Sequence, residues 1–431
     1  MAIVLNRRGL IPTKTAVFRV DAGPGIGMGH FMRCRTLAFE MIRRNWVVFF
    51  VGHGLPEELL AETSGDVNRV INLIDFAQFK ESRADAAAFF NFLSERFHWF
   101  VDCVIIDTYR YSRDDYALFQ RFNPGRVHIV VIDDLADRDT PAQIVINPNP
   151  LFDPMPYERQ KIPHICCGQK YTLIRPEICA IIGRAWRVDG PIIVTLGGGD
   201  VVEHLMKVLE AIPEDVLNPV CVSISDNCPR LEIEAWVARN PTRRYINTDS
   251  RKFPELLASA SLALTGGGGT LWEVYALGVP SLCLLWVDNQ RQTSVIIKEQ
   301  ATSFLIDIVS RINVDLQSEW LENSLQTFVK TVGGHGQTRS VQQQGFCADE
   351  VISREKTSLG IGSSDLIDAD FIRKTLARLH AEPEFWKEMI RRQQSLIDGR
   401  GAQRCVDVID NASWQAVPLF DADWRRSYEN W

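Results

Sequence analysis

The hydrophobic positions of the N-terminal half form short continuous runs that are separated by amphipathic stretches. These runs cover residues 15–22, 46–51, 101–107 and 127–134, with a shorter one at 143–147. Between the first two runs, residues 30–45 place apolar side chains at helical spacing. Continuous apolar runs are typical of strands buried on both faces of a parallel sheet. The pattern predicts a parallel α/β sheet with a site at the carboxyl ends of its strands.

The same plan begins again after Asp189-Gly190-Pro191. Further apolar runs lie at residues 192–196, 220–225, 244–248, 262–265 and 281–287. Helical stretches separate them, and residues 271–277 follow a glycine cluster. We interpret the chain as two Rossmann-like halves with a cleft between them, which is a common place for a ligand.

The domain limits follow from these two series. We expect an N-terminal domain at residues 16–188 and a C-terminal domain at residues 189–412. Residues 331–365 are rich in Gly, Ser, Gln and Thr and lack periodicity, which predicts a long loop insertion. The tail, residues 413–431, contains three of the eleven tryptophans. We expect this tail to dock on the body or on a second subunit, which would make the protein a homo-oligomer.

Composition narrows the class of protein. Hydrophobic residues make up 46% and charged residues 23%, as in soluble globular proteins. The net charge of −7 provides no overall positive field for nucleic acid or acidic lipid. The N-terminal apolar run is interrupted by Asn6-Arg7-Arg8, and no stretch of about 18 residues stays apolar. The ten cysteines include no C-x-x-C pair. We expect a cytoplasmic protein with reduced thiols that binds neither nucleic acid nor membrane.

The densest candidate for chemistry is the glycine-rich stretch at residues 21–34, between the first strand and the first helix. Its glycines let backbone N–H groups approach a ligand, and a helix N-terminus favours an anion such as a diphosphate. The G-x-G-x-x-G fingerprint is met in no register, and Gly52-His53 stands where a ribose-binding acid would follow the second strand. NAD is therefore disfavoured. His30 stands beside this loop, where it could take a proton from water or contact a phosphate. A helix-capping or packing histidine is the alternative.

A second glycine loop lies between a later strand and helix. It comprises Gly266, Gly267, Gly268, Gly269 and Thr270. Two anion-binding loops of this kind suit a sugar nucleotide. Glu273, one turn into the helix, could accept hydrogen bonds from two ribose hydroxyls. Alternatively, it complements the helix dipole, which is worth only about 0.3–1 kcal/mol.

Other candidates are weaker. Tyr109 follows the strand at residues 101–107 and either aims a phenol into the cleft or packs under the loop. Asp288-Asn289-Gln290 follows the last strand, where ligand contacts or a polar turn are expected. No cluster has metal-ligand spacing, and neither G-x-x-x-x-G-K-[ST] nor G-x-S-x-G occurs. We expect chemistry without a metal, ATP or another cofactor.

Several motifs occur in an order that resembles a known enzyme family. They are FRVDAGPGIGMGHFMRC, IIDTY, VIDDLADR, VINPNP, GQKYTLIRPEI, VTLGGGD, LTGGGGTLWEVYALGVPSL with DNQ, and IDGRGAQR. The chain is similar to the UDP-2,4-diacetamido-2,4,6-trideoxy-β-L-altropyranose hydrolases of pseudaminic acid biosynthesis over about residues 16–310 and 390–410. The most specific stretch is I-G-x-G-H-x-x-R-C. This family is related to the GT-B glycosyltransferases, among them the N-acetylglucosaminyltransferase of peptidoglycan synthesis.

The resemblance implies a GT-B-like α/β fold, with two Rossmann-like domains, parallel sheets and an interdomain cleft. It also implies hydrolysis of a UDP-sugar by water attack at the anomeric carbon, with inversion and release of UDP and without metal. The product would serve nonulosonic acid synthesis for flagellin or another surface glycan. His30 would be the general base. Gly27, Gly29, Arg33, Tyr109, Asn289 and Gln290 would serve the sugar side, and Gly266–Gly269, Thr270 and Glu273 would hold UDP.

The chain departs from this family in its length, because the motifs do not account for the leader, residues 331–365 or the tail. Two alternatives of different classes remain. One is a GT-B glycosyltransferase that uses a UDP-sugar, and the other is a catalytically silent protein that binds a sugar nucleotide. Release of UDP without an acceptor would argue against the first, and failure to turn over a bound sugar nucleotide would support the second.

Overall fold

The structure of the protein is a computed structural model. It describes residues 14–23, 28–56, 71–76, 81–98, 100–121, 127–150, 153–197, 202–226, 228–287, 290–308, 312–314 and 367–412. The expectations for Gly27, Asn289, the 331–365 insertion and the Trp-rich tail lie outside these residues. The described residues fall into two compact units. The first contains those up to Arg184, residues 275–278 and those from Gln394 onward, and the second contains residues 185–274 and 279–393.

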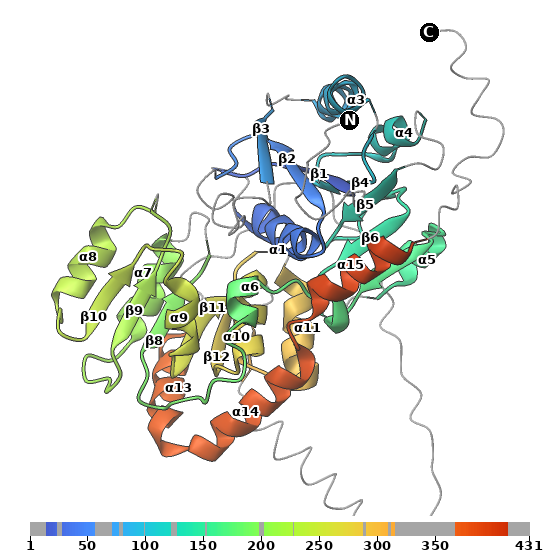
Figure 1. Ribbon diagram of the computed structural model, residues 1–431. Coiled ribbons are helices and arrows are strands. Elements are labelled where there is room, and N and C mark those ends of the chain that lie inside the picture. The colour runs from blue at the N-terminus through green and yellow to red at the C-terminus, as the bar shows by residue number, and fades with distance from the viewer. Residues whose placement is uncertain are drawn as a thin grey trace, which may run out of the picture. The chain divides into compact units, whose positions relative to one another are not determined.

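The first unit is built around a seven-stranded parallel sheet (Figure 1). Its strands are β1 (Thr15–Val20), β2 (Val47–Gly52), β3 (Ile71–Asp75), β4 (Cys103–Asp107), β5 (His128–Ile132), β6 (Ile144–Asn147) and β7 (His164–Cys167). Its helices are α1 (Gly29–Arg43), α3 (Ser82–Phe97), α4 (Arg113–Arg121), α5 (Met155–Arg159), α6 (Pro176–Cys179) and α15 (Gly401–Asn411). The strand order is β3-β2-β1-β4-β5-β6-β7. Each neighbouring pair is parallel, so all strands end at the same edge.

Helices cover both faces of this sheet, because alternate side chains of a strand point to opposite faces. On one face, Phe18 and Ile105 pack with Phe31 and Leu37 of α1 and with Val406 of α15. On the other face, the side chains of β1, β4 and β5 pack with aromatic residues of α3 and α4, including Phe89, Tyr116 and Phe119. Both faces are therefore buried, which accounts for the continuous apolar runs in the sequence.

The second unit contains another seven-stranded sheet, in the order β10-β9-β8-β11-β12-β13-β14. Its strands are β8 (Ile192–Thr195), β9 (Val220–Ser223), β10 (Arg244–Asn247), β11 (Leu262–Gly266), β12 (Ser281–Leu285), β13 (Phe304–Asp307) and β14 (Ile312–Val314). Its helices are α7 (Val202–Ala211), α8 (Leu231–Ala238), α9 (Phe253–Ala258), α11 (Arg291–Gln300) and α13 (Ala369–Ala381), with the larger parts of α10 (Gly269–Leu277) and α14 (Pro383–Leu396). Only β14 of these strands is antiparallel to its neighbour.

Both sheets have a point at which the strand order reverses direction. In the first sheet this point lies between β1 and β4, and in the second between β8 and β11. Ligands of open α/β sheets bind outside the carboxyl ends of the strands at such a point. Gly23 follows β1, and Gly267 and Gly268 lie between β11 and α10. The predicted fold class, two Rossmann-like units with parallel sheets, is confirmed, and the strands β1 and β11 that precede these glycines lie at the switch points.

Helix α15 belongs to the first unit, whereas the sequence analysis included it in a C-terminal domain that ends at residue 412. The reason is its apolar face: Cys405, Val406 and Ile409 are buried against α1 and the first sheet. Two ion pairs hold the same helix. Arg44 Nη1 lies 2.6 Å from Asp407 Oδ1, and Lys14 Nζ lies 2.8 Å from Asp410 Oδ1.

The cysteines of the described residues are all free thiols, and six of the nine are buried. Burial raises the pKa of Cys103 and of Cys283 well above the ordinary value, so these thiols stay neutral and act as packing residues. Within the same residues, the helices are too short or too polar to cross a membrane.

The turn before α15 provides a test of how this helix is held. A Cβ added to Gly401 would lie 2.0 Å from the carbonyl oxygen of Thr172, so Gly401→Ala must separate α15 from that segment. We expect a loss of about 1–3 kcal/mol in stability, measured as a lower thermal unfolding midpoint. Gly269→Ala is the control, because a Cβ there meets nothing within 4 Å. Equal midpoints for the two variants would contradict this account of the packing.

Candidate functional site

One face of α1 presents three side chains to the end of β4. His30, Arg33 and Cys34 are spaced i, i+3 and i+4, so they lie on one side of the helix. The helix begins at Gly29, directly after the loop that follows β1. Because β1 and β4 are neighbours, with Val20 paired to Asp107, this helix face meets the last residue of β4.

The carboxylate of Asp107 accepts hydrogen bonds from all three of these side chains. His30 Nδ1 lies 2.6 Å from Oδ1. Arg33 binds both oxygens, with Nη2 2.6 Å from Oδ1 and Nε 2.6 Å from Oδ2. Cys34 Sγ lies 3.5 Å from Oδ2. Burial by itself raises the pKa of Asp107, but Arg33, together with His30, lowers it to well below the ordinary value, so the group is ionised.

The contact with Asp107 assigns the tautomer of His30. An ionised carboxylate has no proton to donate, so a separation of 2.6 Å requires the proton to be on Nδ1. In the neutral ring, Nε2 then carries the lone pair and is the basic nitrogen. The His30 side chain is 12% exposed, whereas that of Asp107 is fully buried. A buried carboxylate that orients an imidazole in this way is the arrangement of a general base.

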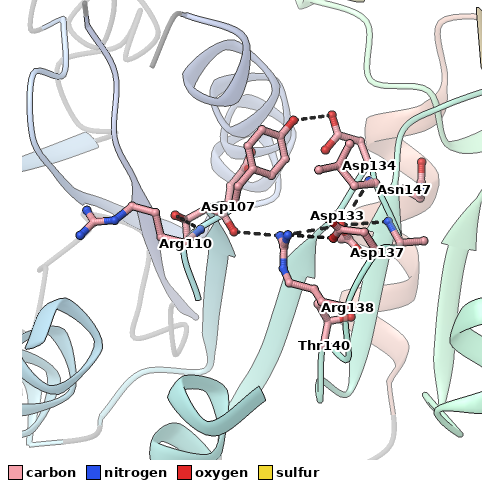
Figure 2. A network of polar contacts seen from close by, with 12 residues as sticks. Asp107, Arg110, Asp133, Asp134, Asp137, Arg138, Thr140 and Asn147 are labelled. Carbon is pink, nitrogen blue, oxygen red and sulfur yellow. Dashed lines mark hydrogen bonds and ion pairs between the residues drawn. The ribbon is translucent and has the colours of Figure 1, made fainter. Parts of the chain in front are cut away.

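A second carboxylate, Asp134, follows β5 and contacts the same arginine. Arg33 Nη1 lies 2.7 Å from Asp134 Oδ2, which also accepts the hydroxyl of Tyr109 at 3.0 Å. Burial raises the pKa of Asp134, and the charge of Arg33 outweighs this effect and lowers it. Figure 2 shows Asp107 and Asp134 following neighbouring strands. Arg33 thus joins two ionised carboxylates from adjacent strand ends.

Tyr109 lies against His30. The two rings meet edge to face with centroids 4.5 Å apart, and Cζ of Arg138 lies 5.8 Å from the tyrosine ring. Burial, followed by the charge of Asp134, raises the pKa of Tyr109, so its phenol is neutral and donates a hydrogen bond. The residue is nevertheless 39% exposed. Of the two expectations for Tyr109, simple packing does not describe this position, because the ring borders His30 and reaches the surface.

A polar network connects the segments that follow β4 and β5. Asp133, fully buried, accepts the backbone N–H of Leu135 and the hydroxyl of Tyr157, at 3.2 and 3.1 Å. Arg138 donates to the carbonyl of Thr108 at 3.2 Å and so ties the loop after β4 to the loop after β5. In Figure 2, Arg138 lies between the end of β4 and the turn that contains Asp133 and Asp137. The network holds Tyr109 and Asp134 in place.

In the second unit, the loop after β11 runs directly into α10. A Cβ at Gly266 would lie 2.5 Å from the ring of Trp286, and one at Gly267 would lie 2.1 Å from Leu285. A side chain at either position would force Trp286 or Leu285 to shift, whereas Gly268 and Gly269 border open space. The N–H groups of the first turn of α10 form a partial positive charge at this loop. Thr270 and Glu273 lie in α10, and Glu273 is 7% exposed.

The structure brings the expected residues together in two groups. His30, Arg33 and Tyr109 meet in the first unit, and Gly266–Gly269, Thr270 and Glu273 form the loop and helix of the second. Gln290 immediately precedes α11, and Thr293 of that helix donates to the carbonyl of Gly267 at 2.9 Å.

The sequence analysis missed Asp107 and Asp134. Asp107 is the last residue of β4, which neighbours β1, and Asp134 follows β5, which neighbours β4. Acidic residues at strand ends beside the switch point are the signal that could have identified them. Within the described ranges, no group of three or more His, Cys, Asp or Glu side chains is arranged to hold a metal ion.

Comparison with known proteins identifies the class of fold. No protein-family model matches the chain, and no curated protein matches its sequence. Solved structures do match. MurG from Acinetobacter baumannii has a TM-score of 0.55 at 11% identity, over 92% of this chain and 99% of that one. The chain has a GT-B-like fold.

Two further structures have the same fold. UDP-GlcNAc 2-epimerase from Neisseria meningitidis, bound to UDP-GlcNAc, has a TM-score of 0.54 at 10% identity, over 92% of this chain and 99% of that one. MnaA from S. aureus, solved with UDP, has a TM-score of 0.52 at 12% identity, over 95% of this chain and all of that one. At such identities the likeness is one of fold.

Replacement of Asp107 tests the electrostatics of the first group. Because the pKa of Asp107 is lowered on folding, its ionised form stabilises the fold above the ordinary pKa near 4, and this stabilisation is lost as pH falls. Asp107→Asn removes the buried partner of Arg33 and should cost about 3 kcal/mol near neutral pH. The difference in unfolding midpoint from the parent chain should narrow between pH 6 and pH 3.

Asp102→Asn, at the opposite end of β4, serves as the control, because its carboxylate accepts the backbone N–H of Thr15 at 2.7 Å. Calorimetric midpoints at each pH give the comparison. A midpoint difference for Asp107→Asn that stays constant down to pH 3 would rule out an ionised Asp107 with a lowered pKa.

Proposed function

We propose that the protein hydrolyses a UDP-linked 2,4-diacetamido-2,4,6-trideoxy sugar by water attack at the anomeric carbon, with inversion and release of UDP. The observation that carries this proposal is the His30–Asp107 pair, which leaves Nε2 of His30 as a basic nitrogen at the switch point of the first sheet. His30 and Asp107 lie in two of the motifs that resemble the hydrolases, FRVDAGPGIGMGHFMRC and IIDTY. The solved structures with UDP-GlcNAc and UDP are consistent with a nucleotide-sugar substrate for this fold.

In this reaction His30 Nε2 takes a proton from water while the water oxygen forms a bond to the anomeric carbon. The bond between that carbon and the diphosphate oxygen breaks, and the electron pair leaves with UDP. Attack opposite the leaving group inverts the configuration. The imidazolium that forms keeps its Nδ1 hydrogen bond to the carboxylate of Asp107.

The glycine loop of the second unit suits the leaving group. UDP departs as an anion, and the N–H groups at the start of α10 would stabilise the charge that develops on its diphosphate. Glu273 would accept the ribose hydroxyls. Tyr109, with Asn289 and Gln290, would contact the sugar. The product would feed the synthesis of a nonulosonic acid for a surface glycan.

The experiment that tests this function is proton NMR of the protein with the UDP-linked 2,4-diacetamido-2,4,6-trideoxy-altrose, without any acceptor. We expect UDP and the free sugar, with the first-formed anomer inverted relative to the substrate. Release that needs an added acceptor would identify a glycosyltransferase. A substrate that binds and stays intact would identify a silent binding protein. Either result would refute the hydrolase.

The role of His30 is tested by His30→Gln. Loss of a general base affects the transition state more than the ground state, so kcat should fall by about 10²–10⁴-fold. The Kd for UDP, measured by calorimetry, should change by less than about threefold. His53→Gln is the matched control, because His53 lies at the end of β2 in the same unit and its side chain is 48% exposed. Turnover by His30→Gln at the parent rate would exclude His30 as the base.

The role of Glu273 is tested by Glu273→Gln. If the carboxylate accepts ribose hydroxyls, losing its charge should weaken UDP binding about tenfold, since hydrogen bonds to a charged group contribute about 1.5–3 kcal/mol. Glu255→Gln, in the first turn of α9, removes a helix carboxylate without a proposed ligand. If both variants are slightly less stable than the parent chain and bind UDP with the parent's affinity, Glu273 only complements the helix dipole.

A further inference from the structure

Arg33 is occupied by carboxylates of its own chain. Its Nε and Nη2 bind the two oxygens of Asp107, each at 2.6 Å, and its Nη1 binds Asp134 at 2.7 Å. Nη2 also lies 3.5 Å from Asp134 Oδ1. The side chain is only 13% exposed. A guanidinium has five N–H donors, so these contacts leave at most one for any other group. Arg33 therefore lacks the two free N–H donors that a bidentate contact with a phosphate needs.

We infer that Arg33 is a positioning residue: it clamps both oxygens of Asp107 so that Oδ1 faces His30 Nδ1 and keeps Nε2 basic. This inference deepens the proposed function and rests on it for its effect on turnover. It also replaces the expectation that Arg33 contacts substrate. The planar fork of the guanidinium determines the rotation of the carboxylate, which a single charge on a flexible chain does not do.

Asp134 gives the clamp its second anchor. Its Oδ2 accepts two hydrogen bonds, one from Nη1 of Arg33 and one from the hydroxyl of Tyr109. Since the Tyr109 ring in turn meets the His30 ring edge to face, the contacts form a closed circle around the imidazole. His30 is thus oriented by Asp107 through a hydrogen bond and by Tyr109 through ring contact, and Arg33 links the two.

Arg33→Lys tests the clamp, because it keeps the charge and loses the fork. In nitrogen-15 NMR of the imidazoles, the His30 signal is assigned by its absence in His30→Gln. When the ring is neutral, the parent should show Nδ1 protonated and Nε2 bare. Arg33→Lys should show a mixture of the two tautomers. Its kcat should fall about 10- to 100-fold, as for residues that orient a catalytic ligand, while KM stays within about threefold.

Arg35→Lys is the matched control. Arg35 lies on the same helix, is 4% exposed and pairs with Glu177 at 2.6 Å. Its replacement changes another mostly buried guanidinium of α1, whose partner Glu177 is 42% exposed, so the His30 signals should keep their parent shifts. If Arg33→Lys leaves the His30 tautomer unchanged and instead raises KM, Arg33 binds substrate and the inference is wrong.

The NMR experiment stands apart from the proposed function. If the parent chain releases no UDP from the sugar nucleotide, the tautomer comparison still decides the role of Arg33. If Arg33→Lys does not fold, the guanidinium nitrogen signals of Arg33 in the parent chain provide a second measurement. They should be unmoved by saturating UDP, and a large shift would overturn the positioning role.

Discussion

The first unit depends on one buried carboxylate. Asp107 ends a central strand with its side chain fully buried, and a lone ionised group in that place would be very unfavourable. Helix α1 resolves this by placing His30, Arg33 and Cys34 around the two oxygens. The same requirement that stabilises the strand end therefore orients the imidazole. The hydrogen bonds that compensate the buried charge thus also orient the imidazole, and Arg33 contributes two of them.

The two units have the same sheet order around their switch points and very different chemistry there. The first has charged and aromatic side chains at the ends of β4 and β5. The second has Gly266 and Gly267 at the end of β11, where an added Cβ would crowd Trp286 or Leu285. In the proposed hydrolysis, the first arrangement would supply a general base and the second would stabilise the anionic leaving group.

Periodicity predicted ten of the strands, because the central residues of a strand buried on both faces are apolar, as in β4 and β5. It did not predict β3, β7, β13 or β14. It could not place α15, since an amphipathic helix carries no mark of which sheet covers its apolar face, and the structure packs Cys405 and Val406 against α1. Residue type and motif selected His30 and Tyr109, whose rings meet edge to face in the structure. The roles of Asp107 and Arg33 depend on which strand lies next to β1, and that pairing becomes visible only in three dimensions.

The most direct test of the account is the position of one proton. A joint X-ray and neutron crystal structure of the deuterated protein, at a pH at which the His30 imidazole is neutral, would show the hydrogen atoms of that ring. The account predicts deuterium on Nδ1, directed at Oδ1 of Asp107, and none on Nε2. Deuterium on Nε2 with a bare Nδ1 turned toward Nη2 of Arg33, which lies 3.1 Å away, would contradict it.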